Sequence, residues 1–274
     1  MAAMEFIRPL DEEKTYDTPF RGYRQQILSN LESGLMLASH IREGGCGPSL
    51  HYHYVDQIYY MIKGTTNVRL GDEVHIAGPG SVVFIPAGLA HCNWNDGPGE
   101  ESHFEMMVPQ TRPVDPLMCP VDSPDDVPVE RRTNRRGYVL TPVPDAATEP
   151  MPGFRMTPLA TPAMGSDHAV VTVAEVDAGK GGPGTHVHEF DQYYFVLDGE
   201  LTIEVALQKH VVGPMTLVIL PAGVPHRQYN DGAVAEKHLS IIIPAPEEGR
   251  PWDVGIDFHL NGKESYGFPI RQGV

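Results

Sequence analysis

Short runs of apolar residues, many of them β-branched or aromatic, recur along the whole chain. Clear examples are QIYYMI, SVVFIP, AVVTVAEV, LTIEVAL and TLVILP. Turn pairs such as Lys63-Gly64 and Asp198-Gly199 separate these runs, a pattern typical of strands joined by tight turns. No segment shows a convincing helical repeat of apolar positions. The pattern predicts an all-β protein built as a sandwich or barrel.

The apolar runs occur in two matched copies. HYHYVDQIYYMIKG starts at His51 and matches HVHEFDQYYFVLDG, which starts 135 residues later at His186. GPGSVVFIPAGLAHCNWNDG starts at Gly78 and matches GPMTLVILPAGVPHRQYNDG, which starts at Gly213, the same distance away. A constant offset without a gap is the mark of an internal repeat. The sequence therefore predicts two domains of one kind.

A proline-rich stretch, residues 111–165, separates a first domain in residues 1–110 from a second in residues 166–274. Its prolines exclude a regular helix or a central strand. We therefore expect an extended connector, with GYVLTPV as its one candidate strand. Four arginines lie within residues 131–136, and such a basic cluster is more often a solvated loop than an anion site.

Composition narrows the class of function. The formal net charge is −16, which disfavours nucleic acids and anionic membranes as partners because both attract a basic surface. Three cysteines do not make a disulfide framework. Neither a signal peptide nor an apolar run long enough to span a bilayer is visible. We expect a soluble cytoplasmic protein with a small-molecule partner, and leave homodimer formation open.

Histidines gather at matched positions of the two copies. His51, His53 and Gln57 are spaced by two and four residues, so on one strand their side chains point to one face. His91 follows on a later strand and would complete the set from across the barrel. A single inward histidine is more often a hydrogen-bonded core residue. A repeated cluster among apolar runs, where unpaired imidazoles are costly, favours a transition-metal site instead.

The second copy offers the same donors at the same spacings, namely His186, His188, Gln192 and His226. We therefore expect one divalent transition metal ion in each domain. Zinc, nickel, cobalt, manganese, iron and copper all accept imidazole ligands.

These motifs resemble the two signature motifs of the cupin superfamily. In the first copy they read Gly45-x5-His51-x-His53-x3-Gln57-x6-Gly64 and Pro86-x-Gly88-x2-His91-x3-Asn95. The resemblance implies a bicupin, that is, two conical, jelly-roll-like antiparallel β-barrels in tandem, each with a metal ion near its middle.

The sequence departs from the usual cupin motif at Gln57 and Gln192, where a glutamate is normal. Three imidazoles and an amide are all neutral, so a bound ion keeps its full charge and becomes a stronger Lewis acid. The set also lacks the carboxylate ligand that would stabilise a ferric state. The ligand set is similar to that of the bicupin isomerase of bacilysin biosynthesis.

Other residues are candidates for the pockets. Tyr59 and Tyr194 follow the glutamines by two positions, and each could donate a proton or merely fill the barrel. His103 and His238, on the strand after the third histidine, could be acid–base groups or structural residues. Candidate substrate-binding groups for an anion are Arg24 and Arg42.

Three functions compete. The leading hypothesis is an enzyme in which the metal acts as a Lewis acid to isomerise, or eliminate from, a small keto, hydroxy or enol metabolite. The alternatives are an iron, nickel or copper dioxygenase of the quercetinase or diketone-cleaving type, and a non-catalytic bicupin that only binds a ligand.

Overall fold

The structure is a computed structural model that describes residues 5–143, 146–247 and 249–256. Within this part the regular secondary structure is almost entirely antiparallel β-strand, so the all-β expectation is confirmed. Its helical segments are single 3-10 turns: η1 (Glu12–Lys14), η2 (Pro124–Asp126), η3 (Val129–Arg131) and η5 (Pro162–Met164). No helix among the described residues is long and apolar enough to cross a membrane.

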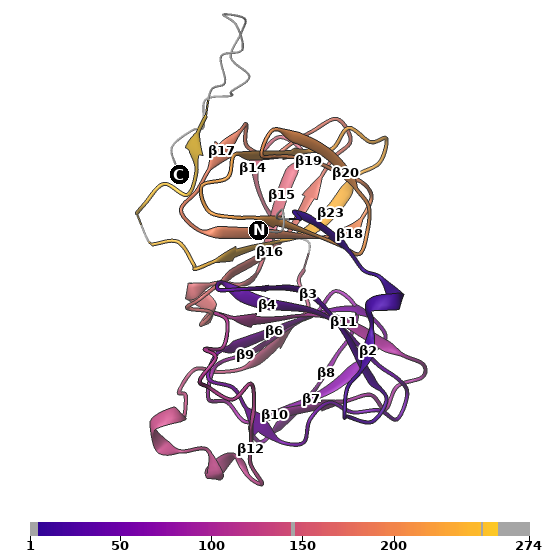
Figure 1. Cartoon of the computed structure of the whole chain (residues 1–274), viewed down its shortest axis with the longest axis vertical. Coiled ribbons are helices and arrows are strands. Elements are labelled where there is room, and N and C mark those ends of the chain that lie inside the picture. Colours follow the sequence, from indigo (N-terminus) through magenta and orange to yellow (C-terminus); the bar gives the residue numbers. More distant parts are fainter. Residues whose placement is uncertain (1–4, 144–145, 248, 257–274) are drawn as a thin grey trace, which may run out of the picture. The chain divides into compact units, whose positions relative to one another are not determined.

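The strands form two compact units, each with one seven-stranded and one five-stranded sheet. The first barrel comprises residues 10–143 and 159–169, and the second comprises the described parts of residues 1–9, 144–158 and 170–274. Figure 1 labels most of their strands. The boundaries expected at residues 110 and 165 stay a prediction about the sequence copies, whereas these two units reflect which segments pack together.

In the first barrel the larger sheet has the order β13-β9-β6-β11-β4-β3-β2, and the smaller has the order β12-β5-β10-β7-β8. The strands are β2 (Tyr16–Asp17), β3 (Tyr23–Leu31), β4 (Gly34–Ile41), β5 (His51–Tyr52), β6 (Asp56–Lys63), β7 (Thr66–Leu70), β8 (Glu73–Ala77), β9 (Val82–Ile85), β10 (His91–Trp94), β11 (Glu101–Val108), β12 (Cys119–Pro120) and β13 (Tyr138–Leu140).

In the second barrel the orders are β1-β21-β18-β23-β16-β15-β14 and β20-β19-β22-β17-β24. The strands are β1 (Ile7–Pro9), β14 (Thr148–Met151), β15 (Phe154–Ala160), β16 (Val170–Val176), β17 (His186–Val187), β18 (Asp191–Asp198), β19 (Leu201–Val205), β20 (Gln208–Val212), β21 (Thr216–Leu220), β22 (His226–Tyr229), β23 (Glu236–Ile243) and β24 (Val254–Gly255).

Alternating side chains of both sheets fill each barrel. In the first barrel Tyr59 and Met61 of β6 pack with Val68 of β7 and Val83 of β9 in one buried cluster. A matching cluster around Tyr194 fills the second barrel. Because successive strand residues face opposite sides, the residues that alternate with these apolar ones cannot share the same interior. Gln57 lies on the same face of β6 as Tyr59 and Met61, and Tyr59 bonds to it inside the barrel.

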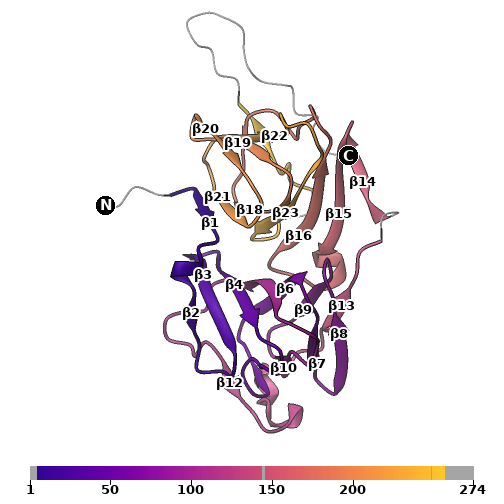
Figure 2. The same ribbon diagram turned by 90° about the vertical axis from the view of Figure 1, so that its right-hand side faces the viewer.

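Two short strands each lie in front of one sequence copy but pair with the barrel formed by the other copy. β1 lies before the first copy but pairs with β21 of the second barrel, as Figure 2 shows. β13 lies before the second copy but pairs with β9 of the first barrel. β13 is the strand expected at GYVLTPV. The exchange covers a sheet edge in each barrel that would otherwise expose unpaired backbone groups.

The arginine cluster of the connector is not simply solvated. Arg135 forms a two-pronged ion pair with the fully buried carboxylate of Asp56, with N–O distances of 2.6 and 2.8 Å. The same carboxylate accepts the backbone N–H of Ala87 at 2.8 Å. Arg131 lies 4.0 Å above the ring of Tyr54. The solvated-loop expectation is therefore wrong for Arg135, because a buried carboxylate needs a partner.

The Arg135→Ala variant is expected to lose about 2–4 kcal/mol of unfolding free energy, since it leaves the Asp56 charge buried and uncompensated. The value lies toward the lower end because the Arg135 side chain is 21% exposed. Urea unfolding followed by fluorescence measures the change. Arg136→Ala is the matched control: this neighbouring arginine is 82% exposed and pairs with an exposed glutamate, so less than about 0.5 kcal/mol should be lost. Equal losses would contradict the argument.

Candidate metal centres

Three segments bring the donors of the first centre together. His51 lies on β5 and His91 on β10, and the two are direct register partners in the smaller sheet. Gln57 lies on β6 in the larger sheet, and His53 lies in the bend between β5 and β6. The expectation that His51, His53 and Gln57 share one strand is wrong. They converge because the chain crosses from one sheet to the other between them, and His91 comes from the neighbouring strand, not from across the barrel.

The three imidazoles of each barrel face one another. Ligand atoms of His51, His53 and His91 lie within 4.8 Å of each other, and all three side chains are buried. The Nε2 atoms of His51 and His53 are 3.2 Å apart. Each trio is therefore compact enough to surround one ion.

The second centre has the same construction. His186 on β17 and His226 on β22 are register partners, and the ligand atoms of these two and His188 again lie within 4.8 Å of each other. The side-chain oxygen of Gln192 is 3.1 Å from His188 Nε2 and 3.2 Å from His226 Nε2. Four donors thus converge here.

Every one of the six imidazoles has its Nδ1 atom against a backbone carbonyl. In the first barrel the acceptors are the carbonyls of Ser49, Leu117 and Leu89, at 2.6–2.9 Å. In the second they are those of Gly184, Phe190 and Val224, at 2.6–2.9 Å. A carbonyl only accepts, so Nδ1 carries the proton and the Nε2 lone pair points inward. Metal-binding histidines are held in this way.

The inward-facing Nε2 atoms are hard to protonate, because burial lowers the pKa of most of these histidines. Burial, followed by the proximity of His53, lowers the pKa of His51 to about 4. Burial and the proximity of His186 lower the pKa of His226 to about 3. His91 Nε2 is buried without any hydrogen-bond partner. Several acceptors that face one another without a proton repel, and a cation relieves the repulsion. The residues therefore fit a divalent metal ion in each barrel.

The two glutamines have different supports. The side-chain amide of Gln57 donates to the carboxylate of Glu105 at 2.6 Å, whereas that of Gln192 donates to the hydroxyl of Ser240 at 3.0 Å. Glu105 and Ser240 occupy equivalent positions in the two copies. In both barrels the amide nitrogen is thereby fixed, and in the second barrel the amide oxygen faces His188 and His226. The first centre gains a buried negative charge that the second lacks.

Glu105 belongs to a buried hydrogen-bonded network in the first barrel. It accepts from the hydroxyls of Tyr23 and Ser39, each at 3.0 Å, and lies 3.8 Å from His103 Nε2. Burial alone lowers the pKa of His103, but the carboxylates of Glu101 and Glu105 outweigh it and raise that pKa to about 10. Burial tends to raise the pKa of Glu105, yet His103 and Gln57 lower it overall. The pair is therefore held as imidazolium and carboxylate.

The tyrosine and histidine candidates lie inside the barrels. Tyr59 donates its hydroxyl to the Gln57 amide oxygen at 3.1 Å, and Tyr194 donates to that of Gln192 at 3.2 Å. Burial raises the pKa of both phenols well above its usual value, so they act as donors only. His103 stacks against Tyr59 with ring centres 4.6 Å apart.

His238 repeats this arrangement in the second barrel. Its ring lies 4.6 Å from that of Tyr194, and Nδ1 lies 3.0 Å from both carboxylate oxygens of Glu236. The acid–base roles of these tyrosines and histidines stay a prediction, although all of them are buried close to the glutamines.

Arg24 and Arg42 do not point at the histidines. Arg24 pairs with Glu100 at 3.2 Å, and strand alternation places it on the face of β3 opposite Tyr23. Arg42 is exposed just after β4. Their role in substrate binding stays a prediction.

Glu105 was missed by sequence reasoning. A match between the copies identified the ligands, but Glu105 is visible only as a difference, since serine stands at the equivalent position. The signal in the sequence was this difference: one copy has an acidic residue at a strand position where the other copy has serine.

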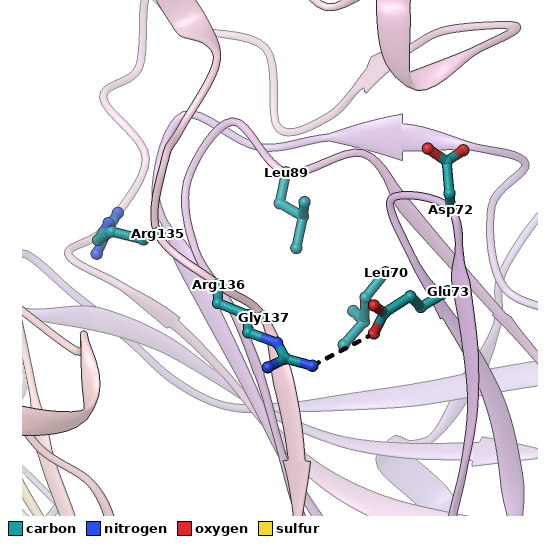
Figure 3. Close-up of a pocket in the computed structure, with 7 residues that line it drawn as sticks. All are labelled: Leu70, Asp72, Glu73, Leu89, Arg135, Arg136 and Gly137. Atoms are coloured by element: carbon teal, nitrogen blue, oxygen red, sulfur yellow. Dashed lines mark ion pairs between the residues drawn. The ribbon is translucent and has the colours of Figure 1, made fainter.

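A pocket of about 250 Å³ opens elsewhere on the first barrel (Figure 3). Leu70 and Leu89 line it together with Gly137, and an ion pair joins Arg136 to Glu73. None of the histidines lines this pocket, and the paired charges leave no single-sign surface for a ligand.

Comparison with known proteins identifies a family for both halves of the chain. The family profile described as "Cupin domain" matches residues 39–108 and 172–242. An uncharacterized protein of Streptomyces coelicolor is 30% identical over 60 residues, which cover 22% of this chain and 57% of that protein. The chain thus spans little more than half of that relative.

Two solved structures are similar over most of their length. A Pseudomonas aeruginosa protein described as glyoxylate-induced has a TM-score of 0.68 at 15% identity, covering 88% of this chain and 90% of its own. Bacillus subtilis oxalate decarboxylase, described as having Mn(II) centres, has a TM-score of 0.66 at 14% identity, covering 93% and 80%. At such identities the likeness concerns the fold.

The metal-free protein should lose stability as the pH falls from about 6.5 toward 4. His51 and His226 have folded pKa values of about 4 and 3, below the unfolded value of 6.5. Between these values the unfolded chain binds more protons, so their contribution is complete above pH 6.5 and declines below it. Each histidine changes the unfolding equilibrium by up to about tenfold per pH unit. Urea unfolding between pH 5 and 7.5 measures this, and His226→Asn should flatten the dependence. An unchanged slope in that variant would refute the assignment.

Replacing each glutamine by glutamate should separate the two centres. Gln57→Glu places a second carboxylate 2.6 Å from Glu105, and the metal-free variant is expected to lose about 2–3 kcal/mol at pH 8. Gln192→Glu faces the Ser240 hydroxyl, a donor, and should lose less than about 1 kcal/mol. Urea unfolding of both variants is the measurement, and equal losses would show that Glu105 is not charged.

Proposed function

The chain belongs to the cupin family, with one cupin domain in each half, and on this premise we propose that it is a metal-dependent enzyme. Its substrate is a small oxygenated metabolite with a keto, hydroxy or enol group next to a second oxygen. The reaction is an isomerisation or an elimination that moves a proton. The observation that carries the proposal is the convergence of three buried, unprotonated imidazoles in each barrel, joined in the second barrel by the Gln192 oxygen.

The donor set favours Lewis-acid chemistry. His51, His53, His91 and Gln57 would hold the ion in the first barrel, and their counterparts in the second. A divalent ion bound there supplies positive charge that polarises a chelated oxygen and stabilises an enolate. All four donors are neutral, so they leave that charge undiminished. A neutral set stabilises a higher oxidation state poorly, which places oxygen-dependent chemistry second.

Residues of the first barrel supply what proton transfer requires. Tyr59 is a buried donor beside the Gln57 oxygen. His103 and Glu105 form a buried imidazolium–carboxylate pair behind it. One group that can give a proton and one that can accept it therefore lie together. Tyr59, His103 and Glu105 are all buried, with at most 5% of each exposed.

The first barrel is the proposed site of turnover. Ser240 stands in the second barrel where Glu105 stands in the first, so the second barrel has no carboxylate behind its glutamine. The similarity in fold to an oxalate decarboxylase with Mn(II) centres supports a small oxygen-chelating substrate and makes manganese a candidate ion. The more specific likeness to the bacilysin isomerase stays a prediction.

Metal content and hydrogen exchange test the proposal. The purified, untagged protein should contain about two metal equivalents by elemental mass spectrometry. His51→Ala and His186→Ala should each remove one. Incubated with small 2-keto and 2-hydroxy acids in D2O, the protein should incorporate deuterium next to the carbonyl, as followed by NMR. His51→Ala should lower that rate by roughly 100-fold or more, and His186→Ala by far less.

Three outcomes would count against the proposal. Turnover that consumes dioxygen would replace it with the dioxygenase alternative. Two firmly bound ions without exchange of any substrate tested would favour the ligand-binding alternative. Absence of metal would remove its basis.

A further inference from the structure

A carboxylate from the segment after the second barrel reaches the second centre. Asp253 directly precedes β24, which pairs with the ligand-bearing strand β17 through Val187–Val254 and His186–Gly255. Figure 1 shows β24 as a short yellow strand beside β17. The Ile256 N–H donates to the carbonyl of Thr185 at 2.9 Å and extends the pairing.

The pairing aims Asp253 at the histidines. Its Oδ1 atom lies 3.7 Å from His186 Nε2, and the side chain is only 25% exposed. Asp253 also acts electrostatically on His188 and on Tyr194. The carboxylate therefore faces the centre as a whole and not one ring alone.

The contact is between two acceptors. His186 gives its Nδ1 proton to the Gly184 carbonyl at 2.7 Å, so Nε2 presents a lone pair to the Asp253 oxygen. A proton on His186 could reconcile these two atoms. It could not also satisfy the contacts of the Gln192 oxygen, which lies 3.1 Å from His188 Nε2 and 3.2 Å from His226 Nε2.

The spacing suits ligands of a common ion. Two atoms bound to one metal at about 2.1 Å lie roughly 3 Å apart when adjacent and about 4.2 Å apart when opposite. The 3.7 Å between Asp253 and His186 falls between these limits.

The first barrel has the same strand but a different side chain. β12 pairs with β5 through Tyr52–Cys119 and His51–Pro120, which repeats the β17–β24 register. Met118 occupies the position equivalent to Asp253. A thioether there adds no charge. Each barrel thus has a carboxylate that the other barrel lacks at the equivalent position. Glu105 lies behind the glutamine of the first barrel, and Asp253 faces the histidines of the second.

We propose that Asp253 is a fifth protein ligand of the second centre and replaces the carboxylate that the glutamine motif omits. The inference rests on the proposal that both barrels bind a divalent metal. It makes the second centre the more fully ligated one and leaves more open positions for substrate in the first.

Cobalt binding measures this directly. In a His51→Ala/His53→Ala background only the second centre should bind Co2+, and competition with a chelator gives its affinity. Asp253→Asn and Asp253→Ala are expected to weaken binding roughly 10- to 100-fold and to change the visible absorption of the bound Co2+, which reports coordination number. Asp231→Asn is the matched control: this exposed carboxylate of the same barrel pairs with Lys209, and affinity should not change.

A reciprocal variant tests the position itself. In a His186→Ala/His188→Ala background, Met118→Asp should tighten Co2+ binding to the first centre. Thermal unfolding of the metal-free Asp253 variants should match their parent, so that loss of affinity is not loss of folding. Unchanged affinity and spectrum in both Asp253 variants would overturn the inference while the metal centres stand. If the parent background bound no Co2+, the proposed function itself would fail at this barrel.

Discussion

Each of six buried imidazoles gives its Nδ1 proton to a backbone carbonyl, and the remaining features of both barrels follow from this. Once that proton is committed, the second ring nitrogen can only accept. The walls around it are aliphatic and aromatic, so few donors are available. The carbonyls lie within two residues of their histidine in five cases, which makes the arrangement almost local. The sixth, Leu117 to His53, couples the first centre to the connector.

The two copies agree at the ligands and diverge around them. An ion fixes the positions of its donors closely, whereas residues one layer out need only balance charge. Glu105 in one copy and Asp253 in the other balance it from different sides of the centre. A duplicated domain can in this way keep two metal sites and give them different chemistry, without change to the histidines.

Much of this was readable from the sequence. The strands, the duplication and the convergence of the histidine motifs follow from periodicity and spacing, which are local properties. The sequence did not reveal that the chain changes sheets between His51 and Gln57, because an alternating pattern looks the same on one strand as across a bend. The pairing of β1 was hidden for another reason. Three residues carry no periodicity, and their partner β21 lies about two hundred residues away. Arg135 and Asp56 are 79 residues apart, and only the fold shows that the acid is buried.

The exchange of β1 also has a consequence for how the chain is synthesised. Ile7–Pro9 leaves the ribosome about two hundred residues before its partner strand β21, which ends at Leu220. At about 5–20 residues per second, the first segment waits roughly ten to forty seconds for its partner strand to be made. The first barrel is complete once the chain has been made up to Ala169, and it can close before β21 exists. Folding during translation therefore proceeds in order, with β1 among the last strands to find its partner.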